Sequence, residues 1–126
     1  MALEYHEPRE QLAPAVIEQH RTIASLIEEL EAVIWYQQRA AASTDGELAS
    51  VLGHNRDEEI EHACMLLEWL RRNFPGFDEK MRIYLFQDKP ILQLEEEAEH
   101  EEQEPPPDDP RSNGQGPTLG VGSMKG

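Results

Sequence analysis

The chain has 126 residues, a length that fits one domain with a single modest hydrophobic core. It carries 26 acidic side chains against 11 lysines and arginines, a formal net charge of -15. Nucleic acid and anionic membranes repel such a chain, so both are excluded as partners and cations are the natural counter-species. No apolar run is long enough to span a membrane, and Cys64 alone supports no disulfide framework. We therefore expect a protein of the reducing cytoplasm.

A first long helix is predicted from about Gln11 to Ala42. Pro14 is tolerated in its first turn, because the N–H that proline lacks would have no partner there. One side of this helix carries a continuous stripe with a spacing of three or four residues, formed by Val16, His20, Ile23, Ile27, Leu30 and Ile34. This stripe needs a second apolar surface to cover it.

A second long helix is predicted to follow a short turn. Thr44 and Glu47 have the spacing of a capping box, which places its start there, and it should run to about Asn73. A shorter helix is expected over residues 78–86. Because the turn is short, the two long helices should be antiparallel. The fold class is therefore all-α, a two-helix hairpin plus a short helix, and a second copy would complete a four-helix bundle.

The composition changes near residue 95 and divides the chain into three parts. Residues 1–94 hold the helical hairpin. Residues 95–117 open with an acidic run and continue with prolines and glycines, so we expect a disordered linker that cannot bury enough apolar surface to fold. Residues 118–126 bring back large apolar residues, spaced by glycines. That pattern is typical of an extended peptide that docks into a groove of another protein.

Two polar residues interrupt the apolar side of the second helix. On a helical wheel Glu59 lies between Leu52 and Leu66, and His62 follows one turn later. Burying an isolated carboxylate costs several kcal/mol unless it is paired or bound to a cation. One interpretation is a structural network, in which His62 binds a backbone carbonyl and Glu59 pairs with an arginine, for which the candidates are Arg56, Arg21 and Arg39.

The other interpretation is a metal site, and it depends on Glu29 of the first helix. Glu29 lies at the edge of the apolar arc and can reach between the helices. Di-iron carboxylate bundles use one Glu from each of two helices and one Glu-x-x-His from each of the other two. With Glu29, Glu59 and His62 this chain carries half of that set, and two chains would carry all of it. Such ligands suit Fe, Mn or Zn.

A second acidic group lies on another face of the first helix. Glu28, Glu31 and Trp35 share one side, which is either a solvated surface or a weak, hydrated cation site. Tyr36 is close to Glu29 on the helical wheel. It is either a core aromatic residue or a hydroxyl that hydrogen-bonds a ligand carboxylate.

Several stretches resemble the encapsulated ferritins. The segments from Glu28 to Tyr36 and from His54 to Ala63 carry the resemblance, and Leu66 to Arg72 and Tyr84 to Phe86 fit it as well. Near the C-terminus, Leu119 to Met124 is similar to the peptide that docks such proteins inside an encapsulin shell.

The resemblance implies a two-helix half-ferritin whose homodimer forms a ferritin-like four-helix bundle and assembles into a decameric ring. It implies a ferroxidase that oxidises Fe(II) to Fe(III) at a di-iron centre shared between two subunits. Iron would be stored and detoxified inside an encapsulin nanocompartment in the cytoplasm. The matching positions are Glu29, Glu59 and His62 for the ferroxidase ligands, Tyr36 for a neighbouring catalytic residue, and Glu28, Glu31 and Trp35 for the site where metal enters, which would take calcium or another divalent ion.

Two other functions remain open from the residues alone. The chain would be a non-catalytic, metal-stabilised scaffold or cargo adaptor if Glu59 and His62 belong to a structural network. It would be a redox-inert divalent-metal buffer if the outer acidic face is the binding site.

Overall fold

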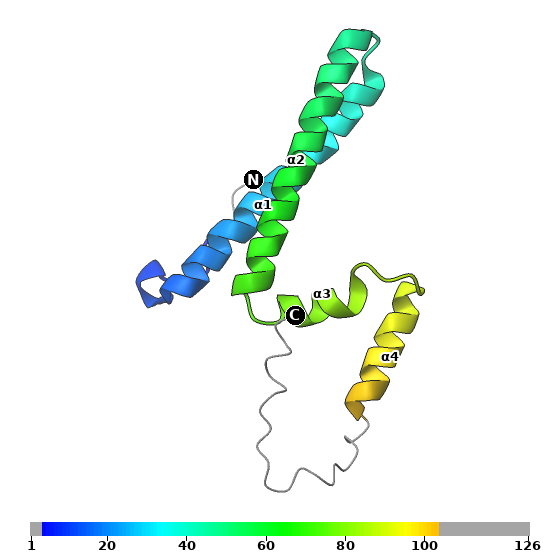
Figure 1. Cartoon of the computed structure of the whole chain (residues 1–126). Helices are drawn as coiled ribbons and strands as arrows, with labels where there is room; N and C mark the ends of the chain where they lie inside the picture. The colour runs from blue at the N-terminus through cyan, green and yellow to red at the C-terminus, as the bar shows by residue number, and fades with distance from the viewer. Residues whose placement is uncertain (1–3, 104–126) are drawn as a thin grey trace, which may run out of the picture. The chain divides into compact units, whose positions relative to one another are not determined.

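Every regular element in residues 4–103, the part that the computed structural model describes, is helical (Figure 1). The elements in chain order are a short 3-10 turn Arg9–Gln11, α1 Pro14–Ala42, α2 Gly46–Asn73, α3 Phe77–Tyr84 and α4 Ile91–Gln103. The predicted all-α class is therefore confirmed. Contacts divide the chain into two compact units, one ending at Leu85 and the other beginning at Phe86. None of the described helices is both long and apolar enough to cross a membrane.

The helices α1 and α2 form the predicted antiparallel hairpin (Figure 1). Near the start of α1, the Gln19 side chain donates a hydrogen bond of 3.2 Å to the backbone carbonyl of Asn73 at the end of α2. Further along α1, Gln37 accepts a hydrogen bond of 2.7 Å from Arg56 in the middle of α2. The residue nearer the start of α1 thus contacts the end of α2, and the residue further along α1 contacts the middle of α2. This antiparallel order places the middles of the two helices opposite each other.

The cap of α2 differs by one residue from the prediction. Asp45, not Thr44, is the N-cap, and its Oδ1 accepts the backbone N–H groups of Glu47 and Leu48, each at 3.0 Å. A carboxylate satisfies two free N–H donors and also interacts favourably with the positive end of the helix dipole. The capping box predicted for Thr44 was therefore wrong, although it placed the start of the helix correctly.

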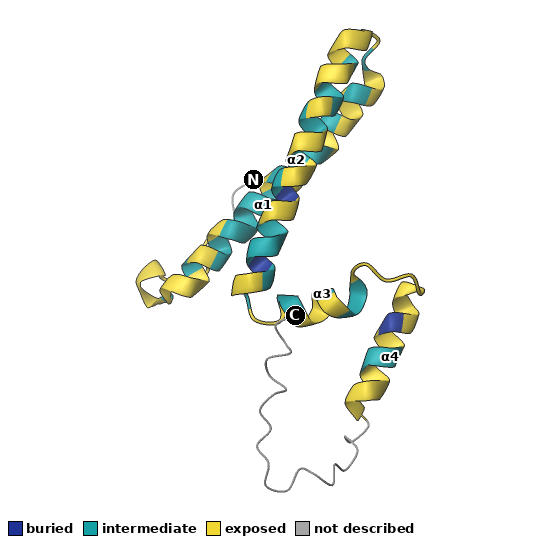
Figure 2. Cartoon of the chain, viewed as in Figure 1, coloured by how far each residue is buried: buried dark blue, intermediate teal, exposed yellow. Residues whose placement is uncertain are grey.

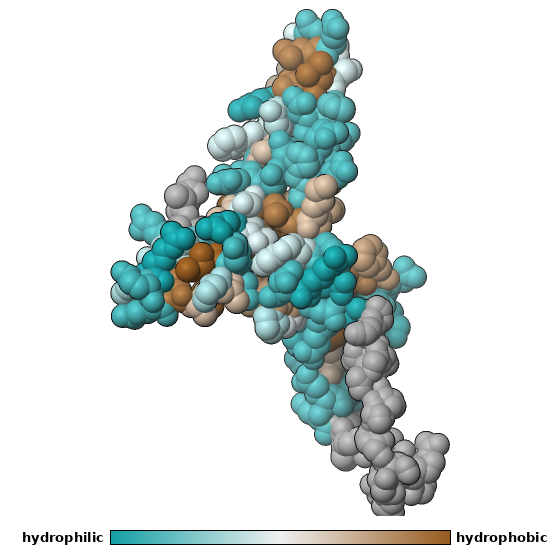
Figure 3. All heavy atoms as spheres, turned by 60° about the vertical axis from the view of Figure 1, so that its left-hand side comes forward, coloured by the Kyte–Doolittle hydropathy of each residue, from teal (hydrophilic) through white to brown (hydrophobic). Residues whose placement is uncertain are grey.

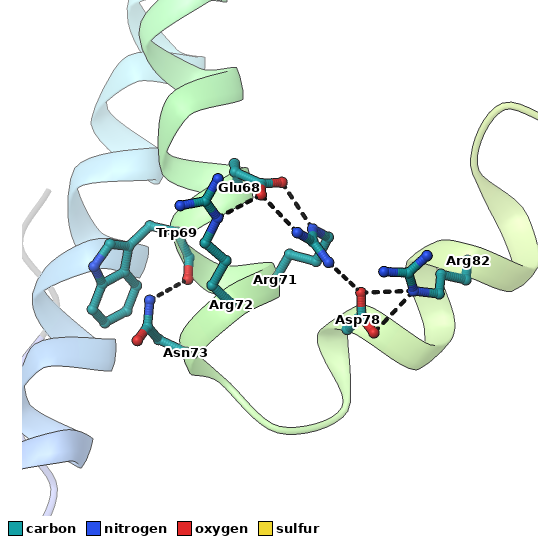
Figure 4. Close-up of polar contacts among 7 residues, drawn as sticks. All are labelled: Glu68, Trp69, Arg71, Arg72, Asn73, Asp78 and Arg82. Carbon is teal, nitrogen blue, oxygen red and sulfur yellow. Dashed lines mark hydrogen bonds and ion pairs between the residues drawn. The ribbon is translucent and has the colours of Figure 1, made fainter. Parts of the chain in front are cut away.

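An ion-pair network joins α2 to α3, and we call it the corner network (Figure 4). Arg71 of α2 donates to both oxygens of Glu68, each at 2.8 Å, and also to Asp78 of α3. Asp78 in turn accepts two hydrogen bonds of 3.0 Å from Arg82. The chain reverses between the two helices through Gly76, whose φ of 101° is a left-handed value that suits glycine. The corner network therefore fixes α3 against the end of α2.

The α3 helix ends two residues before its predicted end. It covers Phe77–Tyr84, Leu85 follows in an extended conformation, and Phe86 has a left-handed φ of 60°. A left-handed residue cannot continue a right-handed helix, so the predicted end at Phe86 was wrong.

The α4 helix occupies the start of the segment in which we expected a disordered linker. It runs through Ile91–Gln103, so residues 95–103 are helical. Glutamates form helices well without a core, and Glu97 is held locally by Lys89 and Gln93 at 3.0 Å each. Composition excluded a packed core but not a local helix. The rest of the expected linker and the C-terminal peptide, including Leu119 to Met124, lie outside the described residues.

The hairpin buries little of its apolar surface (Figure 2). Among the described residues of α1 and α2, only Ala63 and Leu70 are fully buried. From the predicted stripe, Leu30 and Ile34 stay about half exposed. Figure 3 accordingly shows apolar side chains reaching the surface in several separate places. A single chain thus leaves much of its apolar face exposed to water. Covering that face with another apolar surface would be favourable.

Candidate metal centre

Three side chains predicted as metal ligands come together across the hairpin. Glu29 lies in the middle of α1, and Glu59 and His62 lie in the middle of α2. One ligand atom from each lies within 4.8 Å of the other two. The His62 Nδ1 is 3.2 Å from Glu59 Oε1 and 3.6 Å from Glu29 Oε1. We call these three residues the carboxylate–histidine cluster.

The local sequence explains this convergence. Glu59 and His62 are three residues apart in α2, so their side chains lie on the same side of the helix. Glu29 meets them because the antiparallel hairpin sets the middle of α1 against the middle of α2. The side chains of Glu29, Glu59 and His62 are 26%, 24% and 44% exposed. The cluster is therefore partly sheltered but still open on one side of the hairpin.

The electrostatics of the cluster are dominated by two carboxyl groups side by side. The pKa of Glu29 is raised, first because its carboxyl group hydrogen-bonds Glu59, then by burial and by the charge of Glu59. The same contact with Glu29 lowers the pKa of Glu59, and a further lowering comes from His62. The hydrogen bond to Glu59 is the main cause that raises the pKa of His62. Two neighbouring carboxyl groups thus share one imidazole, and a divalent cation between them would favour the ionised form of both.

No arginine supplies that compensation within residues 4–103. Arg21 pairs with Glu18 on its own helix, at 2.9 Å. Arg56 binds Asp57 at 2.9 Å and Gln37 at 2.7 Å. None of the three arginines that sequence analysis offered as partners of Glu59 contacts it. The structural network of Glu59 with an arginine is therefore wrong for this chain.

Arg39, the third candidate, lies over two aromatic rings of α1 instead. Its guanidinium carbon is 5.7 Å from the ring centre of Tyr36 and 6.0 Å from that of Trp35. These are cation–π distances, at which a guanidinium is attracted to the face of a ring. In the described part of the chain, Tyr36 makes no hydrogen bond to the carboxylate–histidine cluster. Its predicted catalytic role stays a prediction.

The outer acidic residues are not drawn into the cluster. Glu28 is exposed, Glu31 is half-buried, and neither makes a hydrogen bond or ion pair within residues 4–103. Trp35 is 53% exposed, which is unusual for a tryptophan in a protein of this size. The structure therefore places these residues on a face of α1 apart from the three clustered side chains. The predicted metal-uptake role of this face stays a prediction.

One carboxylate near the cluster, that of Glu58, was not predicted from the sequence. His62 Nε2, the ring nitrogen that points away from Glu29 and Glu59, is 4.0 Å from Glu58 Oε1. The other oxygen of Glu58 is 3.8 Å from His54 Nε2. The spacing of four residues on either side of Glu58 was visible in the sequence. The sequence did not show which ring nitrogen of His62 this carboxylate approaches.

The donor set fits a transition metal. Two carboxylates and one imidazole per chain are ligands that Fe, Mn and Zn accept, whereas Mg and Ca prefer an all-oxygen shell. The site offers these three donors without a competing arginine and stays open on one side. A single chain supplies too few protein ligands to enclose an ion, so water or a second chain must provide the others.

Three comparisons with known proteins give matches over most of the chain. A family profile described as EncFtn-like matches residues 4–88. A "Ferritin-like protein" of Thermotoga maritima is 56% identical over 98 residues, which is 78% of this chain and 86% of that protein. An "Encapsulated ferritin-like protein" of Rhodospirillum rubrum is 49% identical over 123 residues, 96% of this chain and 87% of that one. The crystal structure of a Nitrosomonas europaea protein has a TM-score of 0.67 and 54% identity, covering 71% of this chain and 98% of its own.

Proposed function

This chain belongs to the EncFtn-like family of encapsulated ferritin-like proteins, and from that premise we propose that it is a ferroxidase. It oxidises Fe(II) to Fe(III) at a di-iron centre that two copies share. The observation that carries the proposal is the convergence of Glu29, Glu59 and His62 from two helices, with no arginine in contact with them within residues 4–103. The predicted structural network would pair Glu59 with an arginine, whereas a metal site leaves carboxylate oxygens and a ring nitrogen for the cation.

The open hairpin supports the sharing of the centre between two chains. Each copy contributes two carboxylates and one imidazole, so two copies contribute four carboxylates and two imidazoles, a full set for two irons. The same pairing would cover the half-exposed apolar residues of α1, such as Leu30 and Ile34, and release the water that now contacts them. One event would thus complete both the metal site and the hydrophobic core.

Iron is the substrate of the proposed reaction. Two Fe(II) ions each lose one electron, and dioxygen takes up both electrons and two protons and leaves as hydrogen peroxide. Glu29 and Glu59 hold the cations and neutralise their charge, and His62 contributes a nitrogen lone pair through Nδ1. The half-buried setting restricts water, which strengthens these electrostatic contacts.

The other assigned residues serve the delivery and fate of iron in this proposal. Glu28, Glu31 and Trp35 form an outer site that attracts divalent ions, including calcium, before they reach the centre. Tyr36 lies on the α1 side of the centre and acts on its ligands when the second copy is present. The dimers assemble into a decameric ring, and Leu119 to Met124 dock the ring inside an encapsulin shell in the cytoplasm, where ferric iron is stored.

An anaerobic titration tests the activity. Metal-free, full-length protein is titrated with Fe(II) and then exposed to air, while ferric absorbance, oxygen consumption, hydrogen peroxide and native mass are followed together. We expect oxidation faster than the protein-free rate, saturating near two irons per dimer. Glu59→Gln and His62→Ala should reduce oxidation to the protein-free rate.

The matched control is Glu79→Gln, which removes the same charge from an exposed position of α3 without a hydrogen bond or ion pair in the described part of the chain. It should oxidise iron like the wild type. Dimer formation with Fe(II) but without oxidation would contradict the ferroxidase proposal and favour a metal-stabilised scaffold. Oxidation that survives Glu59→Gln would show that the centre lies elsewhere.

A further inference from the structure

The two nitrogens of the His62 ring face two different carboxyl environments. Nδ1 points toward the pair formed by Glu29 and Glu59, at 3.6 and 3.2 Å. Nε2 points the other way, toward Glu58 Oε1 at 4.0 Å. Within residues 4–103, no other acceptor contacts Nε2. The ring therefore stands between the proposed ligands on one side and a single carboxylate on the other.

We propose that Glu58 is a positioning residue for the metal centre, which accepts the Nε2–H of His62 and so directs the Nδ1 lone pair at the cation between Glu29 and Glu59. This inference rests on the proposed metal site. An imidazole that gives one nitrogen to a cation carries its remaining hydrogen on the other nitrogen. Metal-binding histidines almost always donate that hydrogen to a carboxylate, a carbonyl or water, which fixes the ring orientation.

The placement of Glu58 suits this role. It lies four residues before His62 on the same helix, so the backbone of α2 sets the distance between them. Its second oxygen faces His54 Nε2 at 3.8 Å, so histidines stand on both sides of the carboxylate along the helix. The 4.0 Å between Nε2 and Glu58 Oε1 must shorten to about 3 Å for a hydrogen bond. Both side chains are about half exposed, which leaves them room to adjust.

The neighbouring glutamate Glu61 provides a matched control. It lies next to His62 on α2, is exposed, and makes no hydrogen bond or ion pair in the part of the chain that the structure describes. Glu61→Gln removes one negative charge close to the cluster without removing a contact to the ring. The difference between Glu58 and Glu61 variants therefore separates ring positioning from a general loss of negative charge.

The test uses Zn²⁺, which has no redox chemistry and so reports binding apart from oxidation. Titration calorimetry on the full-length, metal-free chain measures Zn²⁺ affinity for the wild type, Glu58→Ala, Glu58→Gln and Glu61→Gln. We expect Glu58→Ala to bind Zn²⁺ about 10- to 100-fold more weakly, the usual cost of losing such a hydrogen-bond partner of a metal ligand. Glu58→Gln keeps an acceptor oxygen and should recover part of that loss, and Glu61→Gln should bind like the wild type.

Nitrogen-15 spectra of the histidine side chains give an independent readout. In the Zn²⁺-bound wild type, His62 should show metal on Nδ1 and hydrogen on Nε2, and Glu58→Ala should shift the Nε2–H signal or lose it to exchange with water. Unchanged affinity and spectra in Glu58→Ala would overturn the positioning role, and so would equal weakening by Glu58→Ala and Glu61→Gln. Glu59→Gln distinguishes this failure from a wider one, since Zn²⁺ binding that Glu59→Gln leaves intact would overturn the metal centre itself.

Discussion

Two clusters of charged side chains lie along α2, and they are built on opposite principles. In the corner network, Glu68 lies against two guanidinium groups, and its pKa is lowered to about 2, first by the two hydrogen bonds that Arg71 donates to it and then by the one from Arg72 (Figure 4). In the carboxylate–histidine cluster, Glu29 lies against another carboxyl group, and its pKa is raised. The first cluster balances its charges with residues of the chain. The second sets two carboxyl groups against a single imidazole, with no lysine or arginine in contact with them within residues 4–103.

This difference distinguishes charges that stabilise the fold from charges that are available to bind a cation. In an ion-pair network at a corner, each pairing adds stability, so its acidic groups lose their protons readily. A site that must bind a cation is destabilising while it is empty, because like charges face each other. The two clusters should therefore respond to the same kind of mutation in opposite ways.

The largest difference should come from neutralising Glu29. We expect Glu29→Gln to abolish tight binding of divalent metal, because one of the three donors of each chain is lost. In the absence of metal, the same variant should melt at the wild-type temperature or above it, because the repulsion of Glu59 is removed and the amide still donates to that carboxylate. Thermal unfolding with a chelator, paired with Zn²⁺ calorimetry, measures both effects. A lower melting temperature without metal would place Glu29 among the structural residues.

Neutralising Asp78 should give the reverse pattern. Asp78 accepts hydrogen bonds from Arg71 and Arg82, and the one from Arg82 is the first cause of its lowered pKa. We expect Asp78→Asn to lower the melting temperature of the metal-free chain by a few degrees and to leave Zn²⁺ affinity unchanged. Hydrogen exchange should rise in α3, which the corner network holds against α2. Weaker Zn²⁺ binding in this variant would mean that the two clusters are coupled.

The stability of the protein should depend on pH through the ionisation of Glu68. Its pKa falls from 4.5 to about 2 on folding, so the folded state binds the proton more weakly than the unfolded state. The stabilisation from Glu68 is therefore complete above pH 4.5 and is lost as the pH falls toward about 2. The difference in unfolding free energy between the wild type and Glu68→Gln, measured by denaturant unfolding at several pH values, should shrink through that range.

The sequence predicted the hairpin and the carboxylate–histidine cluster because both depend on local spacing. Glu59 and His62 interrupt an apolar side at helical spacing, and Pro14 marks the start of the first long helix. Features that depend on the direction of a side chain or on the angle between two helices were not predictable in this way. Examples are Glu58, whose contact with His62 depends on the orientation of a ring, and Asp78, whose contact with Arg71 depends on the turn at Gly76.

The α4 helix was missed for a different reason. Its composition predicted that residues after 95 could not build a core, and that argument concerns burial rather than local hydrogen bonding. A run of glutamates with Lys89 and Gln93 in reach of Glu97 forms a helix from contacts within the segment. Low apolar content is an argument about packing, and it was wrong as an argument against a helix over residues 95–103.

Salt gives the smallest and most selective test of the comparison. Raising the salt concentration from about 0.1 to 1 M shortens the screening length from about 10 to 3 Å, which weakens interactions between exposed charges. At the corner network the interactions lost are attractive, so the stability gap between the wild type and Asp78→Asn should narrow as the wild type loses stability. At the carboxylate–histidine cluster the charge interaction between Glu29 and Glu59 is repulsive, and salt weakens it. Any stability advantage of Glu29→Gln over the wild type should therefore narrow, because the wild type becomes more stable at high salt. Melting temperatures of the three metal-free proteins at both salt concentrations measure the two gaps together. If salt lowered, or raised, the stability of the wild type relative to both variants, the two clusters would not differ in the balance of their charges.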